Sequence, residues 1–188
     1  MGLLIKERLM MFFRGSPSSY IIATHRTALA NGLDVTLDEL EAHHLCGGDP
    51  GNVITQLLKA RDAGFELDWE RACAIELATK GSHESLELAV DQAIHPGSHI
   101  FEQTLGNDRP WNVAIVLLYR IELSRYVGGA EIDVLEERIR HALEESYSSW
   151  RSTFEAAPPK ELWENEVMSK ELDSGTRLRL LGCRIVEL

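Results

Sequence analysis

Adjacent histidines with a cysteine two residues further on form the cluster in this 188-residue sequence that most suggests metal ligands: His43, His44 and Cys46. Zinc sites built on one helix use ligands at positions i and i+4, because those side chains share a face. Neighbouring histidines point in different directions on a helix, and a further ligand such as His25 would have to come from another helix. We therefore expect packing and capping roles for these histidines, and no metal site.

Residue patterns of nucleophilic catalysis are missing from the sequence. It has no Gly-x-Ser-x-Gly elbow, and no cysteine lies in a setting that would favour the thiolate. Cys73 falls in the middle of a predicted helix among apolar residues, which is typical of a core position. The paired acids Glu136-Glu137 and Glu144-Glu145 lie opposite an apolar stripe, so a solvated helix face explains them. We expect no catalytic residue and no cofactor.

Gly47-Gly48-Asp49-Pro50-Gly51 precedes a predicted helix, and helix N-termini can bind anions. The stretch lacks the lysine and the spacing of a phosphate loop, so we interpret it as a turn between helices. Trp111, Trp150 and Trp163 lie in stretches with few basic residues and indicate core positions rather than base-stacking platforms. A net charge of −11 also argues against a general nucleic-acid binder.

The charge is unevenly distributed, because residues 1–26 hold four basic residues and one acidic residue. This N-terminus is compatible with peripheral contact between residues 1–14 and an anionic membrane, and equally with an ordinary first helix. Lys6, Glu7 and Arg8 interrupt its apolar residues, so no apolar run reaches the roughly 18 residues of a spanning helix. Three widely spaced cysteines fit a reducing cytoplasm. We expect a cytoplasmic protein, with a peripheral position at the inner membrane face left open.

The elements that would hold these residues begin with a repeat. Gly32–Glu39 and Gly64–Arg71 share one order of small, apolar, acidic and capping residues at an offset of 32 residues, which is typical of stacked helical hairpins. Thr36 with Glu39 predicts a capping box, and Asp49 and Asp68 predict further helix starts. Ser16 and Pro17 likewise predict the start of a helix that reaches about Asn31. A short helix containing Leu86 to Val90 would follow.

After His95-Pro96-Gly97 the pattern changes to strands. The turn cluster Gly106–Pro110 predicts a hairpin, and alternation predicts a strand over Val113–Val127. A long helix from Glu131 to about Ala157 carries an apolar stripe of Ile132, Leu135, Ile139, Leu143, Tyr147, Trp150 and Phe154. A short helix over Glu161–Glu171 and a final strand over Arg177–Leu188 follow, the strand with Leu178 and Leu180 inward and a bulge at Gly182.

This order predicts an α+β protein, with tandem helical hairpins followed by a small antiparallel sheet packed on a long helix. We divide it into residues 1–15, a short amphipathic segment; residues 16–95, the helical repeat region; and residues 96–188, the α+β domain.

Four blocks of residues resemble motifs of bacterial flotillin-like proteins of the FloA type, in the same order. They lie at Gly32–Leu58, Glu70–Ala78, Tyr126–Ala130 and Leu172–Thr176, within a resemblance that covers roughly Pro17 to Leu188. The second block reads Glu-Arg-Ala-Cys-Ala-Ile-Glu-Leu-Ala where the family reads Glu-Arg-Ala-Ala-Ala-Ile-Asp-Leu-Ala. The positions that the resemblance marks for interactions are Leu40, Glu41, His43, Gly47, Gly48, Glu70, Arg71, Gly128 and Gly129.

The resemblance implies an SPFH (band 7, prohibitin-homology) domain preceded by a helical segment. It also implies a non-enzymatic scaffold that forms homo-oligomers and organises microdomains at the inner membrane face. The family begins with a membrane-inserting segment, where this sequence has only Met1–Phe13, and it continues into a coiled coil from about Leu188 onward. We expect a relative without these two segments, natural or trimmed.

Two functions follow from the sequence and the resemblance. The first is a flotillin-like scaffold or adaptor that self-associates, with the final strand and the hairpin edge pairing with another copy, and that docks a protein partner on its helical repeats. The alternative is a soluble protein-binding module with no membrane role.

Overall fold

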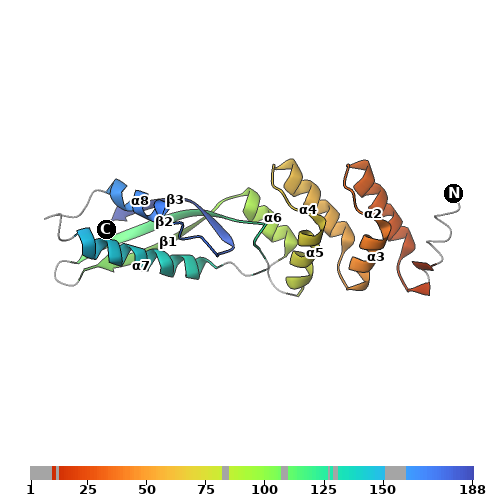
Figure 1. Cartoon of the computed structure of the whole chain (residues 1–188), viewed down its shortest axis with the longest axis horizontal. Helices are drawn as coiled ribbons and strands as arrows, with labels where there is room; N and C mark the ends of the chain where they lie inside the picture. Colours follow the sequence, from red (N-terminus) through yellow and green to blue (C-terminus); the bar gives the residue numbers. More distant parts are fainter. Residues whose placement is uncertain are drawn as a thin grey trace. The chain divides into compact units, whose positions relative to one another are not determined.

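The computed structural model describes residues 10–11, 13–81, 85–106, 110–126, 128, 131–150 and 160–188. The chain divides into two compact units, Met1–Val90 and Asp91–Leu188, which are described separately. The predicted α+β class is confirmed: seven helices and one three-stranded antiparallel sheet are found among the described residues, with the strands in the later part of the chain (Figure 1). The contact division falls inside the helix Leu86–Ile94, and our domain boundaries after residues 15 and 95 stay predictions.

The first unit consists of helical hairpins. Its helices are α2 (Ser18–Ala30), α3 (Leu37–Leu45), α4 (Pro50–Asp62) and α5 (Trp69–Ala78), followed by α6 (Leu86–Ile94) across the division. The α4–α5 pair begins 32 residues after the α2–α3 pair, as the repeat predicts. Helix α2 packs against α3 and α4, and α4 packs against α5. The core between them is apolar and fully buried at Ile21, Leu40, Val53, Ile54, Ala72 and Ile75.

Both hairpins turn in the same way. Gly32 and Gly64 have φ values of 73° and 81°, a left-handed conformation that costs glycine little. The residue after each glycine donates its N–H to a carbonyl five residues earlier, Leu33 to Ala28 and Phe65 to Ala60, each at 2.9 Å. This is the hydrogen bond that closes a Schellman motif, so the repeated glycines encode a repeated helix end.

The predicted helix starts are confirmed at three positions and wrong at one. Thr36 and Glu39 form the capping box, and the Asp49 and Asp68 side chains accept N–H groups of the following turn. At α2 the residue in the capping position is Pro17, with no side-chain capping bond. Ser16 does not cap, because its hydroxyl donates to Glu41 of α3 instead, 2.8 Å away.

The second unit is a sheet of strand order β1-β2-β3, with β1 at Gly97–Leu105, β2 at Trp111–Ile121 and β3 at Leu178–Glu187. The predicted hairpin around Gly106–Pro110 is confirmed, although residues 107–109 lie outside the described residues. Leu178 and Leu180 are buried as predicted. A register shift skips Leu181, one residue from the predicted bulge at Gly182.

The predicted end of the second strand is wrong. β2 stops at Ile121, and a turn follows in which the N–H groups of Arg125 and Tyr126 both donate to the Glu122 carbonyl. Leu123 is buried within this turn. Because Leu123 is buried, the alternation of buried and exposed residues continues past Ile121. The sequence pattern therefore predicts a strand longer than the one that forms.

Two helices, α7 (Ile132–Trp150) and α8 (Lys160–Ser169), pack along the sheet (Figure 1). The predicted stripe of α7 is buried at Leu135, Ile139 and Leu143. Phe154 and the predicted helix end near Ala157 lie outside the described residues. The tryptophans form an aromatic core, as predicted. Trp163 is fully buried, with ring centroids 5.0 Å from Trp111 and 4.3 Å from Trp150.

Candidate functional site

Five of the marked positions, Leu40, Glu41, His43, Gly47 and Gly48, lie on α3 and in the turn that follows it. Leu40 is fully buried in the helical core, so its role is packing. Glu41 is 2% exposed, and its carboxylate accepts from Arg14 Nη1 at 2.7 Å and from the Ser16 hydroxyl. A buried carboxylate with charged and neutral donors is well compensated, so Glu41 fastens the segment before α2 to α3.

His43 is the centre of this part of the helical unit. The residue is 5% exposed, and its ring lies edge-on to Trp69, with centroids 5.7 Å apart. Its Nε2 lies 3.2 Å from Oε2 of Glu76 on α5. Both atoms are buried, and neither has a hydrogen-bond partner among the described residues. The contact between α3 and α5 therefore depends on packing of the His43 ring against Trp69. The pair His43–Glu76 becomes an ion pair only when His43 is protonated.

The two glycines after α3 fit this arrangement closely. The backbone N–H of Gly48 donates to the His43 carbonyl at 3.0 Å. A Cβ on Gly48 would lie 2.2 Å from His43 Nε2, inside the ring's van der Waals surface. Gly47 has a φ of 88°, and its carbonyl accepts from the Lys80 ammonium beyond α5. The turn thus brings the chain against the face of the histidine, and only glycine fits at Gly48.

Polar groups extend from this turn to α2 and α5. The Asp49 N–H donates to Glu76 Oε1 at 3.2 Å, and Asp49 Oδ1 accepts from the Tyr20 hydroxyl on α2 and from the Gly51 N–H at 3.0 Å. Burial alone would raise the pKa of Asp49, but the hydrogen bonds outweigh it and lower that pKa. We call the set Tyr20, His43, Gly47, Gly48, Asp49, Glu76 and Lys80 the α3–α4 junction.

The sequence did not identify Tyr20, Glu76 and Lys80 as members of this junction. Glu76 did carry a signal, because it is a charged residue between Ile75 and Leu77 in an otherwise apolar helix turn. The other marked positions do not join the junction. Glu70 is exposed in the first turn of α5, and the Arg71 N–H donates to the capping Asp68 at 2.7 Å. Gly128 has a φ of 99°, and Gly129 lies outside the described residues.

The second unit has its own charged cluster, where one sequence interpretation is wrong. Glu136 is not simply solvated: it lies 2.5 Å from His99 Nε2 and accepts two bonds from Arg140, at 2.9 and 2.7 Å. Burial alone would raise the pKa of Glu136, but these partners outweigh it and lower that pKa. Arg140 also lies 4.5 Å above the Phe101 ring. The cluster fastens α7 to β1.

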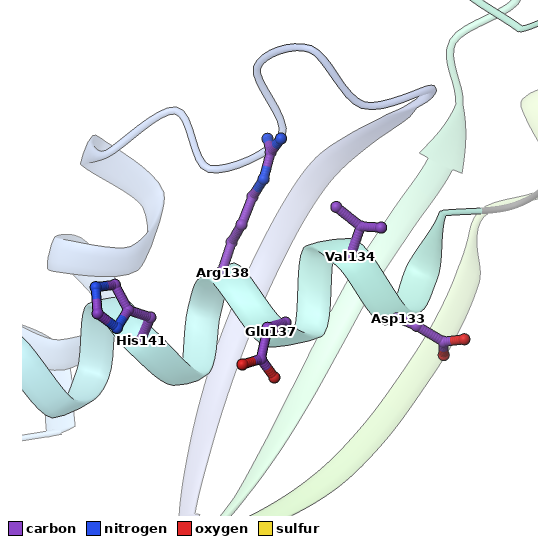
Figure 2. A pocket seen from close by; sticks show the side chains of 5 residues that line it. All are labelled: Asp133, Val134, Glu137, Arg138 and His141. Carbon is purple, nitrogen blue, oxygen red and sulfur yellow. The ribbon is translucent and has the colours of Figure 1, made fainter.

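A shallow hollow of about 500 Å³ lies on the outer face of α7, lined by Asp133, Val134, Glu137, Arg138 and His141 (Figure 2). Figure 2 shows Arg138 directed away from the helix toward a loop, where its Nη1 donates to the Ser174 carbonyl at 2.6 Å. That guanidinium is therefore occupied in holding the loop. The hollow contains no residue that the sequence had marked.

Metal binding and thiol reactivity can both be assessed among the described residues. Across the described ranges no group of three or more His, Cys, Asp or Glu side chains could hold a metal ion. Burial raises the pKa of the Cys73 thiol to about 12, and that of Cys183 likewise to about 12, which suppresses both thiolates. No helix in the described part of the chain has the length and apolar character needed to cross a bilayer. The class defined here is an α+β protein whose buried polar groups fasten elements to one another.

Comparison with known proteins gives the family. The family model described as Flotillin-like protein FloA matches residues 2–188. The chain is 28% identical over 188 residues to a flotillin-like protein FloA of Opitutus terrae, covering 95% of this chain and 56% of that protein. It is also 28% identical over 187 residues to the one from Staphylococcus aureus strain JH9, covering 100% of this chain and 55% of that protein.

The chain belongs to the flotillin-like FloA family. It spans about half the length of the curated relatives it matches. No solved structure matches it.

The buried His43 makes the stability of the helical unit depend on pH. Burial lowers its pKa below the ordinary value of 6.5, and attraction to Glu76 opposes this only in part. Because the unfolded chain binds the proton more readily, His43 contributes stability that is present above pH 6.5 and is lost as the pH falls through the folded-state pKa. We expect a lower urea midpoint at pH 5 than at pH 8.

The variant His43→Gln should reduce this difference between the two midpoints, because it removes the group that titrates. His44→Gln, at the half-buried neighbouring histidine, is the matched control and should preserve the difference. An unchanged difference in His43→Gln would assign the pH dependence to other groups.

Proposed function

We propose that this protein is a non-enzymatic, flotillin-like scaffold or adaptor that self-associates and docks protein partners, at the cytoplasmic face of the membrane in microdomain organisation. The observation that carries the proposal is the family match over residues 2–188. Within the chain it is supported by polar groups that connect helices rather than converge on a cavity, as Glu41 and Asp49 do.

The membrane part of the proposal rests on charge. The chain as a whole has a net charge of −11, which disfavours binding to anionic lipid, whereas residues 1–26 hold four basic residues against one acidic residue. Basic side chains interleaved with apolar ones suit the surface of an anionic bilayer. Residues 1–14 are therefore the segment proposed to make peripheral membrane contact.

The docking part of the proposal concerns the helical repeat. Stacked hairpins present a continuous surface built from equivalent positions of successive units. Glu70, in the first turn of α5, is exposed and is thus available to a partner, whereas Glu41 and His43 are buried. Among the marked positions of the helical unit, Glu70 is accordingly the one proposed to touch a partner protein.

Two measurements on the full chain test the proposal. Sedimentation velocity across a concentration series should show growing association, and flotation should show binding to vesicles of phosphatidylcholine with phosphatidylglycerol but not to phosphatidylcholine alone. Deleting residues 1–13 should abolish flotation and preserve association. Association without flotation in either form would favour the soluble binding module. A strict monomer that never floats would contradict the scaffold.

A further inference from the structure

One face of the sheet in the second unit is apolar and open. Helices α7 and α8 contact the face formed by the odd-numbered residues of β1 and β2, as the pairs His99–Glu136 and Trp111–Trp163 show. The even-numbered residues lie on the opposite face, which no described helix of this unit covers. On that face Ile100 is 63% exposed, Leu118 44% and Val186 41%.

These residues form one continuous patch across the strands. The ladder places Ile100 beside Val116, and Val116 beside Arg184. The next row along is Glu102, Ala114 and Val186, and the row on the other side is Ser98, Leu118 and Gly182. We call this set the outer sheet face: its centre is apolar, and opposite charges lie on its two edge strands, Glu102 on β1 and Arg184 on β3.

The edges of the sheet are less available than this face. On β1 the carbonyl of Glu102 accepts from Arg140 Nη1 of α7 at 2.8 Å. On β3 the N–H of Leu180 donates to Asp173 at 2.9 Å, and that of Ile185 donates to Glu164 of α8 at 3.1 Å. A further strand would need these groups, and capping them is how natural sheets prevent edge pairing. The edge pairing expected from the sequence is therefore the less favourable route to self-association.

We propose that the outer sheet face is the contact between two copies of this chain, packed face to face about a two-fold axis parallel to the strands. This rests on the self-association in the proposed function and names its surface. Such an axis lays β1 of one copy over β3 of the other and keeps the rows level. Glu102 of each copy then faces the row of Val186 in its partner, and Arg184 of the partner lies one row away, within reach of its long side chain. A two-fold contact must be self-complementary, and this pair of opposite charges makes it so.

A second copy fits this face better than a lipid surface does. Within the patch Glu102 offsets the charge of Arg184, and the chain's net charge of −11 opposes approach to anionic headgroups. Within a dimer the same carboxylate meets a guanidinium. Charge complementarity of this kind fixes register and partner choice more than it adds affinity, while the apolar centre supplies the burial that drives association.

The dimensions of the face set the expected affinity. Three strands about 4.8 Å apart and about nine residues long, at about 3.3 Å per residue, give roughly 400 Å² per copy. The total is below the roughly 1,200 Å² at which standard interfaces begin, so the pairwise contact is expected to be weak and to depend on concentration. Such a contact suits a scaffold, in which many copies held near one another multiply weak contacts.

Sedimentation equilibrium of the full chain, from micromolar to millimolar concentration, tests this surface. Leu118→Glu should weaken dimerisation about tenfold or more, because it places a charge at the apolar centre of the contact. Leu162→Glu, on α8, is the matched control: Leu162 is 43% exposed, and its substitution should leave the dimerisation constant unchanged. Far-UV circular dichroism confirms that each variant is folded.

Charge exchange tests the two-fold arrangement itself. Glu102→Arg and Arg184→Glu should each weaken dimerisation, and the double variant should restore it, because both reciprocal contacts return with their signs reversed. Association that is unaffected by Leu118→Glu and by both charge variants would overturn this surface and leave the scaffold standing. A wild-type monomer at all concentrations would overturn both. Loss of vesicle flotation in Leu118→Glu, with association intact, would show that the face meets lipid and not a copy.

Discussion

Replacing Gly48 with alanine is expected to destabilise the helical unit by about 3 kcal/mol, the upper part of the range for overpacked sites. The added methyl would lie 2.2 Å from His43 Nε2 and 2.3 Å from its Cε1. The ring has little room to move, because it packs on Trp69 and is almost fully buried. Urea unfolding followed by circular dichroism at helix wavelengths measures the loss.

Two further variants distinguish the steric overlap between the new methyl and His43 from the general cost of replacing a glycine. Gly64→Ala introduces a methyl with nothing within 4 Å, so only its φ of 81° is unfavourable. It should cost about 1 kcal/mol, the lower part of the range for a left-handed L-residue. The double variant Gly48→Ala with His43→Ala should recover part of the Gly48→Ala loss, because the truncated side chain makes space. Losses that simply add would show that the methyl and the ring do not compete.

The helical hairpins could be predicted from sequence because their signals are local. Thr36 with Glu39, and Asp68 with Arg71, form caps between residues three positions apart. Gly32 and Gly64 end helices through bonds that span five residues. These interactions join residues that are close in the sequence, so they can be recognised from local sequence patterns. The repetition of the patterns at a fixed offset strengthens the prediction of each helix end. Element order therefore followed from the chain alone.

Contacts between distant residues were not visible in this way. Arg14 meets Glu41 across 27 residues, and Asp49 meets Glu76 across another 27. The spacing of His43 to His44 suggests a metal ligand, whereas the charged neighbour of His43 is Glu76 from the second hairpin. The helix face alone predicts a solvated Glu136, whereas β1 supplies His99 as its partner. Pairings of this kind follow from how elements pack, which periodicity does not encode.

The marked positions on α3 and its turn also show whether the family resemblance informs about fold or about function. Glu41 is enclosed by Arg14 and Ser16, and Gly48 is fixed by the ring of His43. These residues are needed to close the hairpin stack, so a resemblance at these positions is informative about fold. The docking and self-association proposed above depend instead on exposed residues such as Glu70 and Leu118. The proposed functional surfaces thus lie apart from most of the residues by which the family is recognised.

The largest single loss in the second unit is expected for Trp163→Ala, about 4 kcal/mol, the middle of the range for removing a buried tryptophan. Trp163 is fully buried and lies against Trp111 of β2 and Trp150 of α7, so its removal leaves a cavity between three elements. Loosening of α8 would also release Glu164 from the edge of β3. Urea unfolding followed by near-ultraviolet circular dichroism, which reports this aromatic core, measures the loss.

Trp163→Phe should cost less than half as much as Trp163→Ala. The phenyl ring fills much of the space, and the buried indole N–H that it removes has no hydrogen-bond partner among the described residues, so no bond is lost. The neighbouring Leu162→Ala, at an exposed position of the same helix, should stay within about 0.5 kcal/mol of the wild type. If Trp163→Ala cost no more than Leu162→Ala, α8 would not be held by this side chain. The aromatic cluster would then be a consequence of the sheet's packing and not its cause.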